Sequence, residues 1–141
     1  VESRGLGDVY KRQASKTSKY AAVRTKLVAL QRGLAKKTDV IMDGRDIGTT
    51  VLPDAFAKIY LTASSDARAK RRYDELKEKG ENCSFDAIKE DIEKRDYEDM
   101  HRAISPLKQA DDAVLVDTSD MNIEQVVAAL SKIIDEKKAG R

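Results

Sequence analysis

The sequence contains a single cysteine, Cys83, so no disulfide bond can form within the chain. A lone thiol is typical of proteins from a reducing compartment, and no signal-peptide pattern opens the chain. Every apolar run is far shorter than the roughly 20 residues that a membrane-spanning helix requires. These absences predict a cytoplasmic protein that has no membrane partner.

Net charge and aromatic side chains are also scarce. The formal net charge is +2, and phenylalanine, tyrosine and tryptophan together make up 5% of the residues. Proteins that bind nucleic acid usually gather positive charge and aromatic rings on one surface. We therefore expect no nucleic-acid partner. A non-enzymatic module that binds through its basic helices stays open as an alternative.

The sequence does contain an alternation of short apolar runs and amphipathic segments. Unbroken runs suit strands covered on both faces of a sheet, whereas apolar residues three and four apart indicate helices. Strands are expected at residues 40–42, 57–62 and 113–117. Helices are expected at residues 14–37, 64–79, 84–103 and 122–134. This alternation predicts an α/β fold with a parallel sheet flanked by helices.

Local signals mark the ends of several helices. Ser64 or Ser65 can cap the helix that follows it, and Gly80 suits the turn that ends that helix. Asn122 and Gln125 form a variant of the capping box at the start of the last helix, whose wide apolar face we expect to pack on the sheet. The helix at residues 14–37 carries one apolar seam, formed by Tyr20, Val23, Leu27, Leu30 and Leu34.

The loop after the predicted strand at residues 40–42 carries Arg45 and Asp46 between two glycines. In open α/β sheets, ligands bind just beyond the carboxyl ends of the strands. Arg45 offers a planar fork for a phosphate, and Asp46 can accept hydrogen bonds from an amino group. Because Asp-Gly pairs are also common in turns, a polar turn without a ligand fits the pattern as well.

Two helices carry further charged residues in regular spacing. Arg68, Arg71 and Arg72 lie on one side of the helix at residues 64–79, where they could surround a polyphosphate or form a solvated surface. The apolar seam of the next helix continues into charged side chains, which need a partner or a ligand if they enter the interior. An ion pair between Arg95 and Asp99 explains part of that seam. It leaves Arg102 unexplained, so the pattern favours a ligand site.

Four stretches, in this order along the chain, resemble the motifs of bacterial cytidylate kinases, which are nucleoside monophosphate kinases. They are residues 43–55 (DGRDIGTTVLPDA), 63–72 (ASSDARAKRR), 93–96 (EKRD) and 102–107 (RAISPL). The resemblance extends from about Ala14 to about Ile134. It implies a P-loop kinase-type sheet, with residues 14–141 as the C-terminal part of one domain and a mobile lid at about residues 64–84.

The resemblance also implies a reaction and a set of site residues. The γ-phosphoryl group of ATP, bound with Mg²⁺, would pass to CMP or dCMP, giving CDP or dCDP, in a protein that is a monomer at full length. Arg45 and Arg102 would hold the acceptor phosphate, while Arg68 and Arg72 screen the transferring group. Ser15, Arg24 and Asp46 would contact the base, with Arg95 and Asp99 near the ribose, and no residue is assigned as a metal ligand.

Alternatives remain for the base-contacting residues. From the helical pattern alone, Ser15 and Arg24 are ordinary surface residues. A kinase that acts on UMP would share the arginines but would differ at Ser15, Arg24 and Asp46. The residues that contact the base would therefore decide whether the kinase prefers CMP or UMP.

One feature departs from the family pattern, and the first thirteen residues differ from the rest of the chain. No Gly-x-x-x-x-Gly-Lys-Ser/Thr loop, which cradles the phosphates of ATP, occurs in these 141 residues. We therefore expect the first strand and the ATP cradle to be missing, and the chain by itself to have little or no kinase activity. Residues 1–13 show no clear period, and we expect them to be a leader foreign to the protein.

Overall fold

A computed structural model describes residues 20–140 of the chain. The chain divides into two compact units, with the boundary between Gly44 and Arg45. The described part of the first unit contains one helix, α2 (Ala21–Ala35). The other elements within residues 20–140 belong to the second unit, namely η1 (Ile47–Val51), β1 (Ile59–Thr62), α3 (Ser65–Glu78), α4 (Phe85–His101), β2 (Val114–Asp117) and α5 (Ile123–Ala139).

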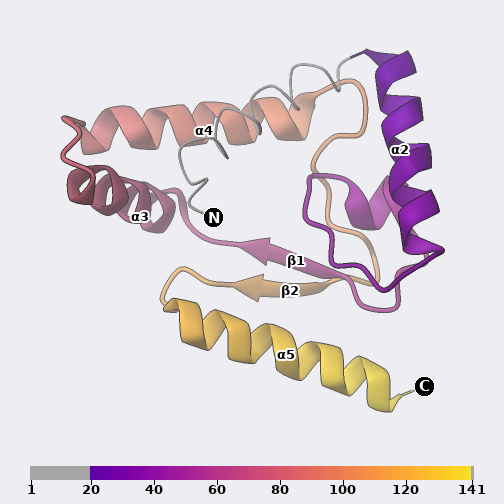
Figure 1. The fold of residues 1–141 in the computed structure, drawn as a ribbon. Coiled ribbons are helices and arrows are strands. Elements are labelled where there is room, and N and C mark those ends of the chain that lie inside the picture. The colour runs from indigo at the N-terminus through magenta and orange to yellow at the C-terminus, as the bar shows by residue number, and fades with distance from the viewer. Residues whose placement is uncertain (1–19, 141) are drawn as a thin grey trace. The chain divides into compact units, whose positions relative to one another are not determined.

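The two strands of the second unit form a parallel pair (Figure 1). Ile59 lies opposite Val114 and Leu61 lies opposite Val116, so apolar side chains share one face. The chain between the strands forms α3 and α4, since a parallel pair needs a long crossover connection. The predicted strands at residues 57–62 and 113–117 and their parallel pairing are therefore confirmed, with slightly later starts.

The predicted strand at residues 40–42 is wrong. These residues form no helix or strand, and Ile41 is 97% exposed. An apolar run becomes a strand only where a neighbour completes its hydrogen-bond ladder. Within the described residues, β1 and β2 pair only with each other.

Helix α2 forms where its seam predicted a helix, although residues 14–19 lie outside the described part. Its seam is not covered: Leu30 and Leu34 are 61% and 51% exposed, and no residue of α2 is buried. Tyr20 occupies the N-cap position, and its side chain makes no capping bond. Propensity and periodicity thus account for the helix itself, but not for any packing of its apolar face.

Helices α3 and α4 begin at side-chain caps. The hydroxyl of Ser64 accepts a bond from the Ala67 amide, and the hydroxyl of Ser84 does the same for Ala87. Helix α3 ends in a turn in which Gly80 has a φ of 73°, a conformation that glycine adopts without strain. The predicted boundaries of both helices are confirmed to within two residues.

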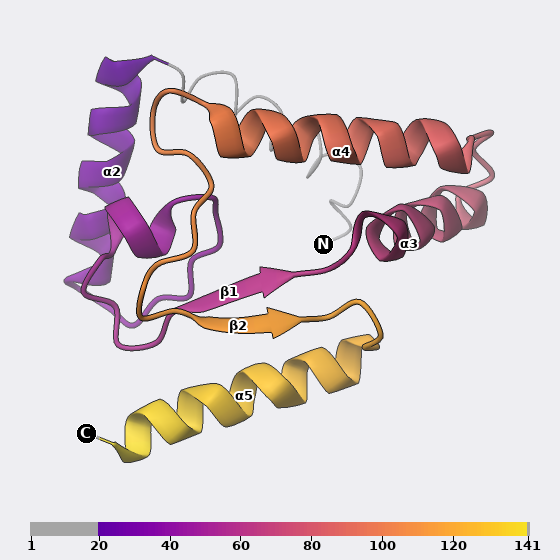
Figure 2. The ribbon, with the colours of Figure 1, turned by 180° about the vertical axis from the view of Figure 1, so that it is seen from behind.

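Helix α5 begins with the predicted capping box, because the side chains of Asn122 and Gln125 each bond the other residue's backbone amide. It runs alongside the sheet in both views (Figures 1 and 2). Its expected apolar face is only partly covered: Ile133 and Ile134 are half-buried, while Ile123 is 79% exposed. Among the helices within residues 20–140, none is long and apolar enough to cross a membrane.

Candidate functional site

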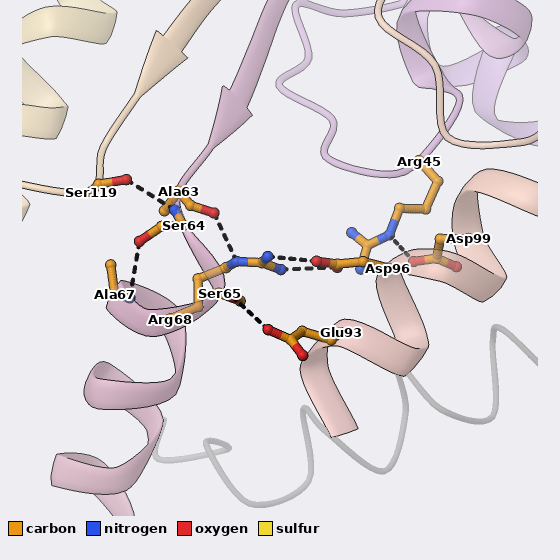
Figure 3. Close-up of polar contacts among 10 residues, drawn as sticks. All are labelled: Arg45, Ala63, Ser64, Ser65, Ala67, Arg68, Glu93, Asp96, Asp99 and Ser119. Atoms are coloured by element: carbon orange, nitrogen blue, oxygen red, sulfur yellow. Dashed lines mark hydrogen bonds and ion pairs between the residues drawn. The ribbon is translucent and has the colours of Figure 1, made fainter. Parts of the chain in front are cut away.

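The guanidinium group of Arg68 is held at the carboxyl end of β1 (Figure 3). Its Nε donates to the Ala63 carbonyl at 3.0 Å, and its two terminal nitrogens donate to the carboxylate of Asp96 on α4 at 2.9 and 2.5 Å. The hydrogen bond to Asp96 raises the pKa of Arg68, and burial opposes this only partly. This two-point pairing is the geometry in which arginine also recognises phosphate.

The two neighbouring arginines of α3 have different partners. Arg71 donates to the carbonyls of Thr118 and Met121, in the turn between β2 and α5. Arg72 bonds Glu75 on its own helix at 3.0 Å. In this structure the three arginines therefore do not converge on one point. The screening role of Arg68 and Arg72 stays a prediction, and the bonds of Arg71 tie α3 to the end of β2.

Two further polar bonds join α3 to α4. The hydroxyl of Ser65 donates to Glu93 at 2.9 Å, and Lys89 pairs with Asp66 at 2.8 Å. Together with the pair of Arg68 and Asp96, they connect the first turns of α3 to α4. Figure 3 shows the bonds of Ser65 with Glu93 and of Arg68 with Asp96. The two helices lie side by side in both ribbon views (Figures 1 and 2). The predicted lid region, at about residues 64–84, thus consists of α3 and the turn after it, and polar bonds join α3 to α4.

A second arginine-carboxylate pair lies one turn further along α4. Arg45 Nε donates to Asp99 at 2.6 Å, with side-chain exposures of 50% and 20% (Figure 3). The predicted ion pair between Arg95 and Asp99 is therefore wrong, since Asp99 pairs with Arg45 and Arg95 is exposed. Helical spacing allows an i,i+4 pair but does not exclude a partner from elsewhere in the fold.

The remaining predicted site residues are Arg102, Asp46, Arg24 and Ser15. Arg102 donates from Nε to the Ser105 carbonyl at 2.5 Å, in the loop after α4. Asp46 is buried at the start of η1, where its carbonyl accepts bonds from the amides of Thr50 and Val51. Arg24 is half-buried on α2, and Ser15 lies outside the described residues.

An open hollow lies between the start of α3 and the turn after β2. It is lined by Ser64, Asp66, Ala67, Lys70, Phe85, Ser119 and Asp120. None of these is a predicted site residue. Within residues 20–140, no group of three or more histidine, cysteine, aspartate or glutamate side chains is placed to hold a metal ion.

Residues 2–136 match the family model of cytidylate kinases. The chain is 55% identical over 124 residues to a cytidylate kinase of Lactobacillus johnsonii, covering 88% of this chain and 54% of that protein. It is 48% identical over 124 residues to a cytidylate kinase of Thermosipho melanesiensis, covering 88% and 57%. The chain belongs to the cytidylate kinase family. It spans about half the length of the curated relatives that it matches.

Membership of the cytidylate kinase family confirms the resemblance of the four motifs. The parallel pair of strands with flanking helices is consistent with part of a P-loop kinase-type fold. Sequence reasoning missed Asp96 and Glu93 as partners of α3. A signal was available for Asp96, because it lies three residues before Asp99 and so on the same side of α4. Nothing in the local pattern, however, indicated which arginine it would meet.

Another ion pair that was not predicted from the sequence lies at the beginning of the sheet. The amine of Lys58 contacts the carboxylate of Asp112 at 2.8 Å and also bonds the Pro53 carbonyl. The Lys58 side chain is only 8% exposed, whereas Asp112 is open to solvent. The hydrogen bond from Lys58 holds the pKa of Asp112 below its usual range. This pair joins the segments before β1 and β2, so its role is structural.

Proposed function

We propose that this chain is part of an enzyme that transfers the γ-phosphoryl group of ATP to CMP or dCMP. Relatives at 48% to 55% identity are named cytidylate kinases, which supports the proposal. The observation that carries it is the pair of arginines, Arg45 and Arg68, whose carboxylate partners lie one turn apart on α4. Phosphoryl transfer depends mainly on positioning and on neutralising charge, which such guanidinium groups provide.

The proposed roles follow the family resemblance. Arg45 and Arg102 align the acceptor phosphate, and Arg68 and Arg72 neutralise charge on the transferring group. Asp46, Ser15 and Arg24 read the base, while Arg95 and Asp99 bind near the ribose. Mg²⁺, bound together with ATP, is the proposed metal cofactor. The ion supplies positive charge beside the phosphates, and the arginines orient them.

The 141 residues by themselves are proposed to be inactive, because they contain no phosphate-cradling glycine loop. The test compares the purified chain with the same chain fused to the part of the Lactobacillus johnsonii relative that it does not span. CDP formation from CMP, ATP and Mg²⁺ is expected only from the fusion. Turnover by the chain alone would contradict its inactivity, and a folded fusion that phosphorylates no nucleoside monophosphate would contradict the kinase proposal.

The same fusion separates the possible acceptors and tests the arginines. We expect kcat/KM for CMP and dCMP to exceed that for UMP; a preference for UMP would favour the UMP-type alternative. Arg45→Ala should lower kcat by roughly 100- to 1,000-fold, the usual effect of removing a group that stabilises transition-state charge. Lys70→Gln is the matched control, since it removes a positive charge from an exposed position on α3.

A further inference from the structure

Two partners within the protein orient the guanidinium group of Arg68. Three of its N–H groups are engaged, one by the Ala63 carbonyl and two by the Asp96 carboxylate. A guanidinium group has five N–H donors in one plane. The carboxylate of Asp96 therefore occupies the end of the fork that would otherwise be open to two oxygens of a phosphate.

The pair is poorly protected from water. The side chains of Arg68 and Asp96 are 36% and 31% exposed, so solvent weakens their attraction. The other nearby carboxylates between α3 and α4 are engaged elsewhere, since Glu93 accepts from Ser65 and Asp66 pairs with Lys89. A group with more negative charge than one carboxylate can thus compete for Arg68.

Two effects of Asp96 on phosphate binding oppose each other. It orients the guanidinium in advance, which lowers the entropy lost on binding. It also neutralises Arg68 and places a negative charge beside any incoming phosphate, which repels it. A polyphosphate carries several negative charges, whereas only one side chain needs ordering, so the charge effect is the larger.

We propose that Asp96 is a counter-ion that competes with phosphate for Arg68 and so limits the affinity of α3 for the phosphate chain of a nucleotide. This proposal rests on the proposed function, because that function places phosphates near Arg68. In the free protein Asp96 occupies Arg68, and a bound phosphate chain displaces it. Release of the carboxylate then leaves both terminal nitrogens of Arg68 for the ligand.

The test is a titration of the 141-residue chain with inorganic tripolyphosphate, followed by NMR on the Nε–H signal of Arg68. Asp96→Asn should tighten binding by roughly 3- to 10-fold, the range expected for removal of a partly exposed ionic competitor. The matched control is Glu93→Gln, which removes one negative charge from the same helix without touching Arg68. It should leave the affinity unchanged, and Arg68→Gln should abolish the gain from Asp96→Asn.

Several results would overturn the proposal. One is that Asp96→Asn and Glu93→Gln increase the affinity for tripolyphosphate equally. Another is that Asp96→Asn leaves this affinity unchanged or lowers it. A third is that the Arg68 signal does not respond to tripolyphosphate in any of the variants. Should Asp96→Asn fail to fold, the carboxyl carbon signal of Asp96 in the unaltered chain decides: it must shift as tripolyphosphate saturates. The titration needs no turnover, so its failure is distinguishable from an absence of CDP formation by the fusion.

Discussion

Helix α2 and the pair formed by α3 and α4 were all predicted from the sequence, but the contacts that their residues make differ. Helix α2 has an apolar seam, no buried residue and no side-chain bond at its N-cap. Helix α3 has a side-chain cap at Ser64, a glycine turn at its end and a completely buried Ala69. Polar bonds within three residue pairs also join it to α4, namely Ser65 with Glu93, Arg68 with Asp96, and Asp66 with Lys89.

The comparison shows that an apolar seam and a packed helix are different properties. The seam of α2 indicates a helix because its residues recur every three or four positions. Packing of that seam depends on a partner surface, which the periodicity does not specify. The contacts between α3 and α4 use charged residues that a sequence pattern assigns to solvent. We therefore expect substitutions in the two regions to have different effects on stability.

The largest expected effect follows Ala69→Leu in α3. Ala69 is 0% exposed, so a larger side chain has to displace its neighbours, which costs about 1–3 kcal/mol of unfolding free energy. Leu30→Ala in α2 is the control and should change the free energy by less than about 0.5 kcal/mol, because Leu30 is 61% exposed. Urea unfolding followed by circular dichroism measures both. Equal costs would mean that the seam of α2 is buried in solution.

The N-caps provide the next contrast. Ser64→Ala removes the bond to the Ala67 amide and should destabilise α3 by about 1 kcal/mol. Tyr20→Ser should stabilise α2 by about 0.5–1 kcal/mol, because it places a capping hydroxyl where the present side chain makes no cap bond. Carbonyl and Cα chemical shifts report the helix content at each end. A Ser64→Ala protein with an unfrayed α3 would argue against the cap.

A smaller effect is expected for the ion pair between the helices. A double-mutant cycle on Arg68→Ala and Asp96→Ala should give a coupling energy of about 0.5–1 kcal/mol, limited by the exposure of both side chains. The pair Arg72 and Glu75, within α3, should give about 0.2–0.5 kcal/mol. Thermal or urea unfolding of the variants provides the energies. A coupling near zero for Arg68 and Asp96 would show that the two helices are held by other contacts.

The smallest expected effect is a loss of stability at the end of α3 at low pH, which α2 should not show. Hydrogen bonds from Lys79 and then Arg72 lower the pKa of Glu75. Because its folded pKa lies below the unfolded one, the stabilisation is present above the ordinary carboxyl pKa and is lost as pH falls through the folded value. Residues 21–35 contain no aspartate or glutamate. On acidification, Cα shifts should therefore report fraying at the end of α3 but not within α2, and Glu75→Gln should reduce this response.

Much of the local structure could be predicted, because it depends on short-range chemistry. The caps at Ser64 and at Asn122 with Gln125, and the two strands around the crossover, follow from residue type and spacing within a few positions. The strand at residues 40–42 was wrong because it required a neighbouring strand. The ion pair between Arg95 and Asp99 was wrong because Asp99 meets Arg45, which lies 54 residues earlier in the chain.

The candidate site, too, was predictable from the sequence only in its local features. Arg45, Arg68, Asp99 and Arg102 stand out in the sequence by motif and by helical spacing, and the cytidylate kinase family is evident from those motifs. The helices, the caps at Ser64 and Asn122, the parallel pairing of β1 with β2 and the family could all be predicted from residue types and their spacing. The pairing of Asp96 with Arg68 and of Asp99 with Arg45 could not be predicted in this way, because a charged side chain has many possible partners and the packing of distant segments selects one.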